Sequence, residues 1–167
     1  MNSWKYVFVA GLCVLLVAGC GQKKPEGFPD IYPATVTVQN AGAPIADATV
    51  LFAGGPSGSW SVAGVTNTRG VAVITTSQGA WQSKGAPAGD YKVYITKVPD
   101  IQQAPLPEEL QNDSAALEKH SAEYLKLLND APKIIPESLT NPAKTPLTLR
   151  VSAGGTAELT VDVSKHQ

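Results

Sequence analysis

Apolar and polar residues alternate along most of this chain. In residues 34–39, Val36 and Val38 alternate with Thr35 and Thr37. A period of two places the apolar side chains on one face of a β-strand. Seven stretches show this pattern and are predicted to be strands: 34–39, 48–53, 61–66, 71–76, 91–98, 147–151 and 159–163. Short strands with one apolar face predict an all-β fold, an antiparallel β-sandwich of about seven strands.

Segments rich in Gly, Pro and Ser separate the predicted strands. Trp60 ends a Gly- and Ser-rich loop over 54–60, and Trp81 lies in a second loop over 77–90. The last two strands are joined by residues 152–156, Ser-Ala-Gly-Gly-Thr, whose glycines favour a tight turn. We therefore expect the chain to end in a β-hairpin.

One segment has a helical pattern instead. Over residues 108–128, apolar side chains such as Leu117 and Tyr124 recur at helical spacing, with charged residues on the other side. Asn112-Asp113-Ser114 supplies capping residues, so we expect a break there. With its Pro-rich flanks the segment forms a predicted helical insertion over 100–145, before the last two strands, and its apolar side requires a surface to pack on.

The first residues have the form of a secretory signal. Lys5 precedes an apolar run that ends in Leu16-Val17-Ala18-Gly19-Cys20. The run is shorter than the roughly 20 residues of a membrane-spanning helix. Its last five residues resemble the lipobox of bacterial lipoproteins, which implies cleavage before Cys20 and a thioether-linked diacylglycerol on its sulfur. An uncleaved anchor helix, or an ordinary signal with this cysteine there by chance, is the alternative.

These features divide the chain into three parts. Residues 1–19 are the predicted lipoprotein signal peptide, and 20–33 are a flexible tether, because they are polar and rich in Pro and Gly. Residues 34–164 form a single predicted β-sandwich domain, which suits a chain of this length.

Charge and cysteine usage exclude several classes of site. A formal net charge of −1 disfavours nucleic-acid binding, which needs a concentrated basic field. Cys13 lies in the predicted signal and Cys20 carries the predicted lipid, so the folded part has no disulfide. His120 and His166 lie on different predicted elements without partners at metal-ligand spacing, so we expect neither a zinc site nor a cofactor.

Four pieces of the chain resemble the carboxypeptidase regulatory-like domain. They are Thr35–Val38, Pro44–Val50 (P-I-A-D-A-T-V), Thr66–Ala72 (T-N-T-R-G-V-A) and Pro87–Val93 (P-A-G-D-Y-K-V). The resemblance covers roughly residues 34–98 and implies a prealbumin-like (transthyretin-like) sandwich, related in shape to the immunoglobulin fold. It implies little about activity.

Catalytic residues are not apparent in the sequence. A Ser-His-Asp triad needs a histidine with a nucleophile and an orienting acid in reach, and His120 has no nucleophile-elbow context. Glu108 and Glu109 are explained as carboxylates that favour a helix start. The 5-hydroxyisourate hydrolase of prealbumin-like fold ends in Tyr-Arg-Gly-Ser, whereas this chain ends in Val163-Ser164-Lys165-His166-Gln167. We therefore expect no enzymatic activity.

Trp60 and Trp81 are the candidate ligand contacts. Loops of a sandwich commonly carry binding surfaces, and aromatic faces stack on sugar rings or on apolar groups of a partner. The alternative is that both rings fold back and cover an open edge of the sandwich. The sequence favours a non-enzymatic, lipid-anchored cell-envelope protein with a structural or protein-interaction role; the alternative is a carbohydrate-binding module that uses the two tryptophans.

The predicted partners follow from the same features. Lipidated Cys20 would hold the chain in a membrane, on the periplasmic side or at the cell surface. A further partner would be an envelope protein or a polysaccharide.

Overall fold

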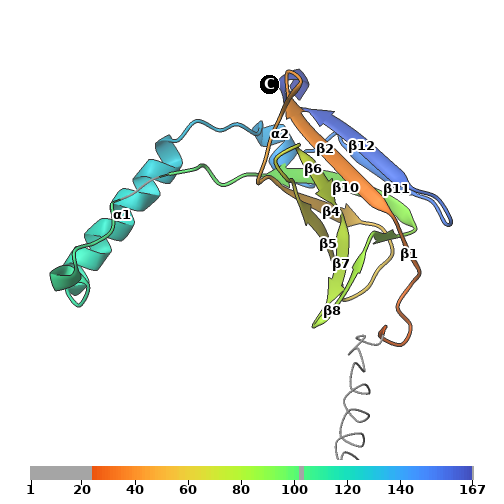
Figure 1. Ribbon diagram of the computed structural model, residues 1–167, viewed down its shortest axis with the longest axis horizontal. Coiled ribbons are helices and arrows are strands. Elements are labelled where there is room, and N and C mark those ends of the chain that lie inside the picture. The colour runs from red at the N-terminus through yellow and green to blue at the C-terminus, as the bar shows by residue number, and fades with distance from the viewer. Residues whose placement is uncertain (1–23, 102–103, 167) are drawn as a thin grey trace, which may run out of the picture.

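The computed structural model describes residues 24–101 and 104–166, and it contains two main β-sheets that face each other across one apolar core (Figure 1). Its strands are β1 (Ile31–Tyr32), β2 (Ala34–Asn40), β3 (Ala43–Pro44), β4 (Thr49–Gly54), β5 (Ser61–Val65), β6 (Val71–Val73), β7 (Thr75–Gln78), β8 (Trp81–Lys84), β9 (Ala86–Pro87), β10 (Gly89–Thr96), β11 (Thr148–Val151) and β12 (Ala157–Asp162).

The larger sheet has six strands in the order β11-β10-β4-β5-β7-β8, all in antiparallel pairs. In the second sheet β2 pairs with β12, β3 and β6, and a short ladder joins β1 to β9. Side chains from both sheets meet in the core, where Val36, Val38, Val50, Val93 and Ile95 are fully buried. Each such side chain stabilises the fold by roughly 1.5–3 kcal/mol. The architecture is therefore mostly antiparallel β-sheet, as the alternation predicts.

The single strand predicted over 71–76 is two strands, because the chain changes sheets at Ile74. β6 pairs with β2 of the second sheet, whereas β7 pairs with β5 of the larger one. The amide of Ile74 donates to the Ala34 carbonyl (3.0 Å), and its own carbonyl accepts from the Gly85 amide (2.6 Å). Alternation continues through this crossing, so the sequence pattern does not reveal it.

The loop predicted over 77–90 is wrong. β8 pairs with β7 as a hairpin, so Trp81 begins a strand instead of lying in a loop. The polar run of Gln82, Ser83 and Lys84 hides this strand, because β8 lies at the edge of its sheet and buries little. The split at Ile74 and the addition of β8 bring the strands of three or more residues to nine, above the seven expected.

The predicted C-terminal hairpin is also wrong. β11 pairs with β10 in the larger sheet, and β12 pairs with β2 in the other, so residues 152–156 carry the chain between the sheets. The β12–β2 pair is parallel, with Leu159 opposite Val36, and the fold is therefore not purely antiparallel. Both strands turn apolar side chains to the shared core, an arrangement that produces the same alternation as a hairpin.

The flexible tether predicted over 20–33 is wrong for its last residues, which lie within the part of the chain that the structure describes. Phe28 is only 7% exposed, and β1 pairs with β9. The segment from Phe28 onward is therefore part of the folded domain. One aromatic residue among prolines and glycines gives no periodicity, and for this reason the pattern suggested a solvated linker.

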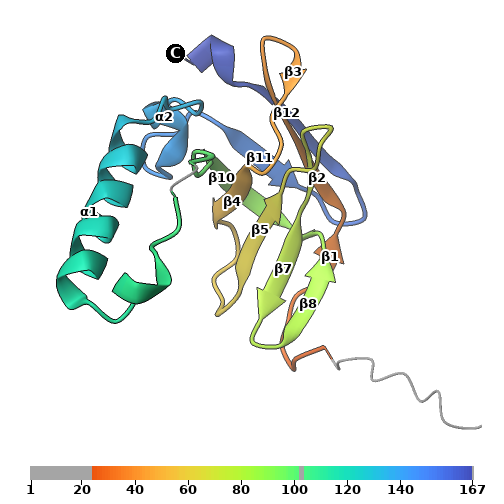
Figure 2. The same cartoon turned by 60° about the vertical axis from the view of Figure 1, so that its left-hand side comes forward.

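The insertion contains a 3₁₀ turn η1 (Glu108–Leu110), the helix α1 (Ser114–Asp130) and the short helix α2 (Glu137–Thr140); a second 3₁₀ turn, η2 (Val163–His166), ends the described chain. The expected break is present, since Asp113 caps α1 by accepting a hydrogen bond from the Ala115 amide (2.9 Å). α2 packs on the sandwich through Leu139, which is fully buried. By contrast, α1 has no buried residue and projects away from the sheets (Figures 1 and 2).

Candidate functional site

An aromatic cluster closes one end of the sandwich. The ring centroid of Phe28 lies 5.0 Å from that of Trp60 and 4.3 Å from that of Trp81. Gly58 lies against the six-membered ring of Trp60, where a side chain would not fit. The structure thus brings the two predicted ligand contacts together through Phe28, a residue that the sequence analysis assigned to the tether.

Both tryptophans remain half-buried instead of fully covered. Trp60 also lines a depression of about 380 Å³ on the outer side of the six-stranded sheet, together with Leu51 and Tyr94. The cluster therefore combines a packing role toward Phe28 with partial access to solvent.

A projecting arm, residues 104–130, is the second feature. It comprises η1, α1 and the segment that leads into them. Among the large apolar side chains of the arm, Leu125 is 59% exposed, and four others are between 37% and 44% exposed: Leu110, Leu117, Tyr124 and Leu127. A helix normally buries its apolar stripe against another element, so this stripe lacks a cover within the described chain.

The arm is organised within itself. The Nε2 atom of His120 lies 2.9 Å from the Ala104 carbonyl, which ties the incoming segment to the side of α1. Prolines occur where the arm joins the domain, at Pro99 on one side and at Pro132 and Pro136 on the other. Proline fixes φ at these positions and cannot donate a backbone hydrogen bond.

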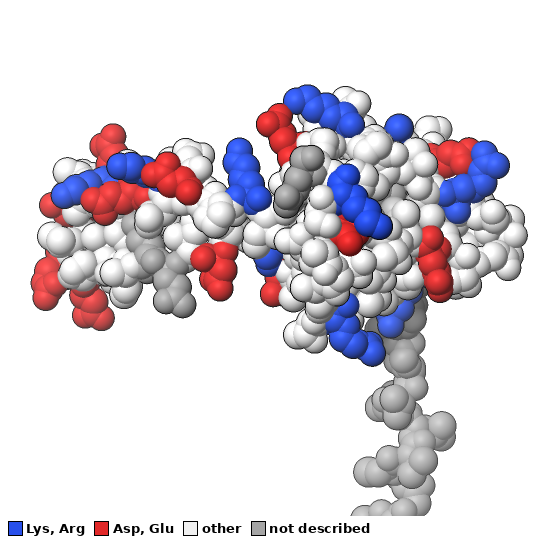
Figure 3. All heavy atoms as spheres, turned by 90° about the horizontal axis from the view of Figure 1, so that it is seen from above, with Lys and Arg blue, Asp and Glu red and all other residues white. Residues whose placement is uncertain are grey.

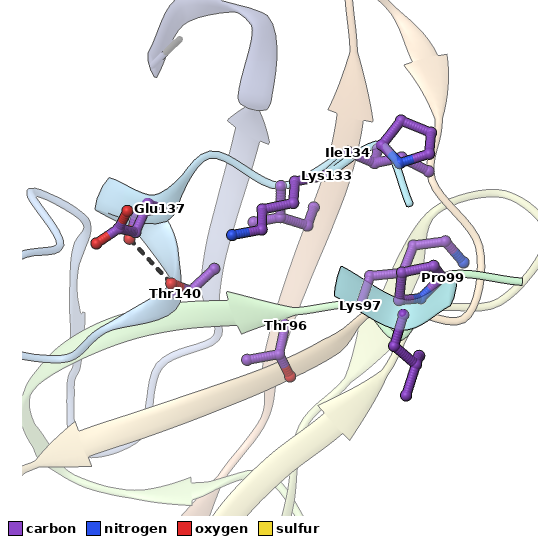
Figure 4. Close-up of a pocket in the computed structure, with 10 residues that line it drawn as sticks. Thr96, Lys97, Pro99, Lys133, Ile134, Glu137 and Thr140 are labelled. Atoms are coloured by element: carbon purple, nitrogen blue, oxygen red, sulfur yellow. Dashed lines mark hydrogen bonds between the residues drawn. The ribbon is translucent and has the colours of Figure 1, made fainter. Parts of the chain in front are cut away.

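A cavity of about 250 Å³ lies at the base of the arm, between the end of β10, α2 and the chain that leaves α1 (Figure 4). Its walls include the apolar side chains of Pro99, Leu128 and Ile135. Glu137 lines it as well and accepts from Lys144 Nζ at 2.9 Å. That hydrogen bond, the charge of Lys144 and the nearby Lys133 lower the pKa of the Glu137 carboxyl. Thr96 and Thr140 supply hydroxyls to this cavity, and none of the described residues that line it is Ser, Cys or His.

Charged pairs elsewhere have structural explanations. Arg150 makes a bidentate contact with Asp90 across β11 and β10 (2.6 and 2.9 Å), and this hydrogen bonding lowers the pKa of the Asp90 carboxyl. The Tyr91 hydroxyl donates to the Pro87 carbonyl (2.8 Å), and burial raises its pKa to about 12. Asp90, Tyr91 and Arg150 also line a shallow depression of about 230 Å³, together with Lys92.

The remaining predicted site residue, Cys20, lies outside the described residues. Within 24–101 and 104–166 no helix is long and apolar enough to cross a membrane. The same residues contain no group of three or more His, Cys, Asp or Glu side chains arranged to hold a metal ion.

Comparison of the chain with known protein families, with characterised proteins and with solved structures gives no match.

Proposed function

We propose that this chain is a lipid-anchored, non-enzymatic interaction module of the cell envelope, with the arm over residues 104–130 as its docking element. The observation that carries the proposal is the apolar stripe of α1, which stays exposed on a helix that has no buried residue. Amphipathic helices of this kind bind partners by laying their apolar face into a groove. A helix with this much unburied apolar surface is otherwise a liability in solution.

The proposed anchor at Cys20 rests on the lipobox resemblance of Leu16–Cys20, and it would hold the domain near the membrane because the path from Cys20 to the domain is short. Phe28 is eight positions after Cys20, and a fully extended chain of eight steps spans at most about 28 Å. Because Phe28 is packed between Trp60 and Trp81, a lipid on Cys20 would keep this end of the sandwich close to the bilayer. The aromatic cluster then acts as the attachment point between anchor and domain.

The prealbumin-like assignment is part of the proposal, and the turn chemistry supports it. In the T-N-T-R-G piece, Asn67 Oδ1 accepts from the amides of Arg69 (2.9 Å) and Val71 (3.2 Å). Gly70 has φ +75° and lies against the backbone of Val38. These contacts give a physical reason for the Asn and Gly on which the resemblance rests.

The test is recovery of a partner from detergent-solubilised envelope by the full chain. We expect wild type to recover a defined protein, and Leu117→Ser with Leu125→Ser to recover at least about tenfold less, since each tenfold is about 1.4 kcal/mol of binding. The matched control changes two charged residues on the side of the helix away from Leu117 and Leu125, Glu123→Ser with Lys126→Ser, and should recover the wild-type amount. Equal recovery by both variants, or no protein recovered by wild type, contradicts the proposal.

Carbohydrate binding is the second candidate function, favoured by the depression in which Trp60 and Tyr94 lie together. It predicts that Trp60→Phe, which preserves the packing on Phe28, weakens retention on isolated cell-wall polysaccharide without changing the unfolding midpoint. If wild type is not retained on the polysaccharide, or if Trp60→Phe is retained equally well, carbohydrate binding through Trp60 is ruled out.

A further inference from the structure

The outer face of the six-stranded sheet carries an uncharged surface across its middle. Cross-strand pairing places Tyr94 opposite Leu51, Leu51 opposite Ala63, and Ala63 opposite Thr75. With the neighbouring outward positions these residues make up the neutral face: Thr49, Leu51, Ala53, Ser61, Ala63, Val65, Thr75, Ser77 and Tyr94. Most of its side chains are small, and Val65 is 60% exposed.

This composition differs from that of an ordinary solvated sheet face. Outward positions of an antiparallel sheet are usually polar and often charged. Here charge appears only at the margins, as Lys84 beyond Thr75, Lys92 beside Ala53, and the paired Asp90 and Arg150 on β10 and β11. Neither lysine forms an ion pair with a residue that the structure describes.

The neutral face lies on the side of the molecule from which the arm projects. In Figures 1 and 2 the six-stranded sheet faces the space beside α1, and no helix lies over β5, β7 or β8. The chain thus holds two uncovered surfaces at once, a helix with large apolar side chains and a sheet face of small ones. Large side chains on a helix pack well on a sheet surface that offers small residues.

The arm is acidic, whereas lysines lie at the border of the neutral face. The arm contains six acidic residues, Glu108, Glu109, Asp113, Glu118, Glu123 and Asp130, and two lysines, Lys119 and Lys126, so its net charge is −4. Figure 3 shows mostly red acidic side chains over the lobe that projects from the domain. The neutral face is bordered by the unpaired Lys84 and Lys92 and by Asp90, whose charge is balanced by its ion pair with Arg150, among the residues that the structure describes. Complementary potentials of this kind orient docking partners.

We propose that the neutral face receives the arm of a second copy of this chain, and that the exchange is reciprocal. The inference rests on the proposed function and names the partner of its docking element. A 17-residue helix is about 25 Å long and about 10 Å wide, so one helix-on-sheet contact buries on the order of 500 Å² in total. This is below the roughly 1,000 Å² of a specific interface, whereas two symmetric contacts reach it.

Reciprocal exchange also closes the assembly. A contact between two different surfaces, repeated in one direction, builds an open chain of molecules. When two copies exchange arms about a two-fold axis, each arm and each neutral face is used once and the dimer is complete. The lipid anchor proposed for Cys20 would favour this pairing, because it holds copies in the plane of one membrane.

The test uses full-length chains in the membrane and cross-linking between two tags. One copy carries Ala63→Cys on the neutral face, and the other, with a different tag, carries Leu125→Cys on the arm. Residues 21–167 contain no cysteine, so a short bismaleimide reports on the introduced thiols, and wild type serves as the blank. The matched control replaces Ala63→Cys with Ala153→Cys in the exposed turn after β11.

We expect a product that carries both tags, at least about tenfold more abundant for Ala63→Cys than for Ala153→Cys. Lys84→Glu with Lys92→Glu should reduce that product about tenfold, since like charges then oppose docking, and Lys165→Glu in η2 should leave it unchanged. Equal yields at the two cysteine positions, or no mixed product, overturn the inference. If Leu125→Cys is instead cross-linked to another protein and not to the second copy, self-docking is wrong while the docking role of the arm stands.

Discussion

The ring of Phe28 lies 4.3 Å from the ring of Trp81, centroid to centroid, and connects the N-terminal segment to the edge strand β8. Trp60 contacts the same phenyl ring from the loop before β5. A residue eight positions after the predicted lipid attachment site is therefore part of the folded domain. If Cys20 carries the proposed lipid, this contact limits how far from the membrane the sandwich lies.

Phe28→Ala is expected to destabilise the domain by about 3 kcal/mol, because a buried aromatic ring is lost and a cavity opens between the two tryptophans. Trp60 and Trp81 are the only tryptophans after residue 19, so their fluorescence during urea unfolding reports directly on this end of the sandwich. Glu26→Ala, at an exposed position of the same segment, is the control and should unfold like wild type. An unchanged midpoint for Phe28→Ala would mean that the cluster does not stabilise the fold.

Gly70→Ala and Gly154→Ala separate backbone strain from steric clash. Both glycines have nearly the same left-handed φ, +75° and +76°, but only a Cβ at Gly70 would meet the Val38 carbonyl oxygen, at 2.5 Å. Gly154→Ala should cost about 1 kcal/mol of stability from the φ angle alone. Gly70→Ala should cost about 3 kcal/mol, because the backbone of β2 must also move. Equal costs in thermal unfolding would contradict the close packing of this turn on β2.

Asp113→Ala tests whether α1 is independent of the sandwich. Removing the N-cap weakens the helix by about 1 kcal/mol, because the Ala115 and Ala116 amides lose their acceptor. Since α1 has no buried residue, we expect faster amide hydrogen exchange over Ser114–Asp130 and an unchanged global unfolding midpoint. The control is Asp100→Ala, outside the helix. A lower global midpoint in Asp113→Ala would show that the arm packs on the domain.

Asp162 links the end of β12 to the turn after β2. Its Oδ1 accepts from the Ser164 hydroxyl (2.7 Å) and from the amides of Ala41 (2.9 Å) and Ser164 (3.2 Å). These bonds, with the Ser164 hydroxyl contributing most, lower the pKa of the Asp162 carboxyl below its ordinary value of 3.8.

The stabilisation by Asp162 is therefore present above pH 3.8 and is lost as the pH falls through the lowered native pKa. Asp162→Asn removes the titrating group, so the fall in thermal midpoint below pH 3.8 should be shallower than in wild type. Glu158→Gln, on an exposed position of the same strand, should keep the wild-type slope. Parallel curves for wild type and Asp162→Asn would refute this linkage.

Much of the β-architecture could be predicted because alternation is a local property. Residues such as Val36, Val50 and Val93 reveal their strands and their inward faces from their own neighbours. Pairing is not local. The crossing at Ile74 and the parallel pairing of β12 with β2 leave the alternation unchanged, so the pattern indicated one strand and a hairpin where the fold has neither.

The candidate site also has parts that the sequence predicts and parts that only the structure shows. The amphipathic pattern around Leu117 and Tyr124, and the cap at Asp113, predict the helix, but only the structure places its apolar stripe away from the sheets. Phe28 was missed because a single aromatic residue in a Pro- and Gly-rich segment has no partner in sequence. Its contacts, Trp60 and Trp81, lie more than thirty and fifty positions away along the chain.

The central claim is that a lipid on one cysteine holds this module at the membrane. Membrane fractionation that compares Cys20→Ser with Cys13→Ser tests it most directly. Dual acylation gives stable anchorage that a folded domain of this kind lacks on its own. We predict that Cys13→Ser is processed and membrane-bound like wild type, and that Cys20→Ser either remains unprocessed or is released into the soluble fraction. Processed, membrane-bound Cys20→Ser would contradict the account.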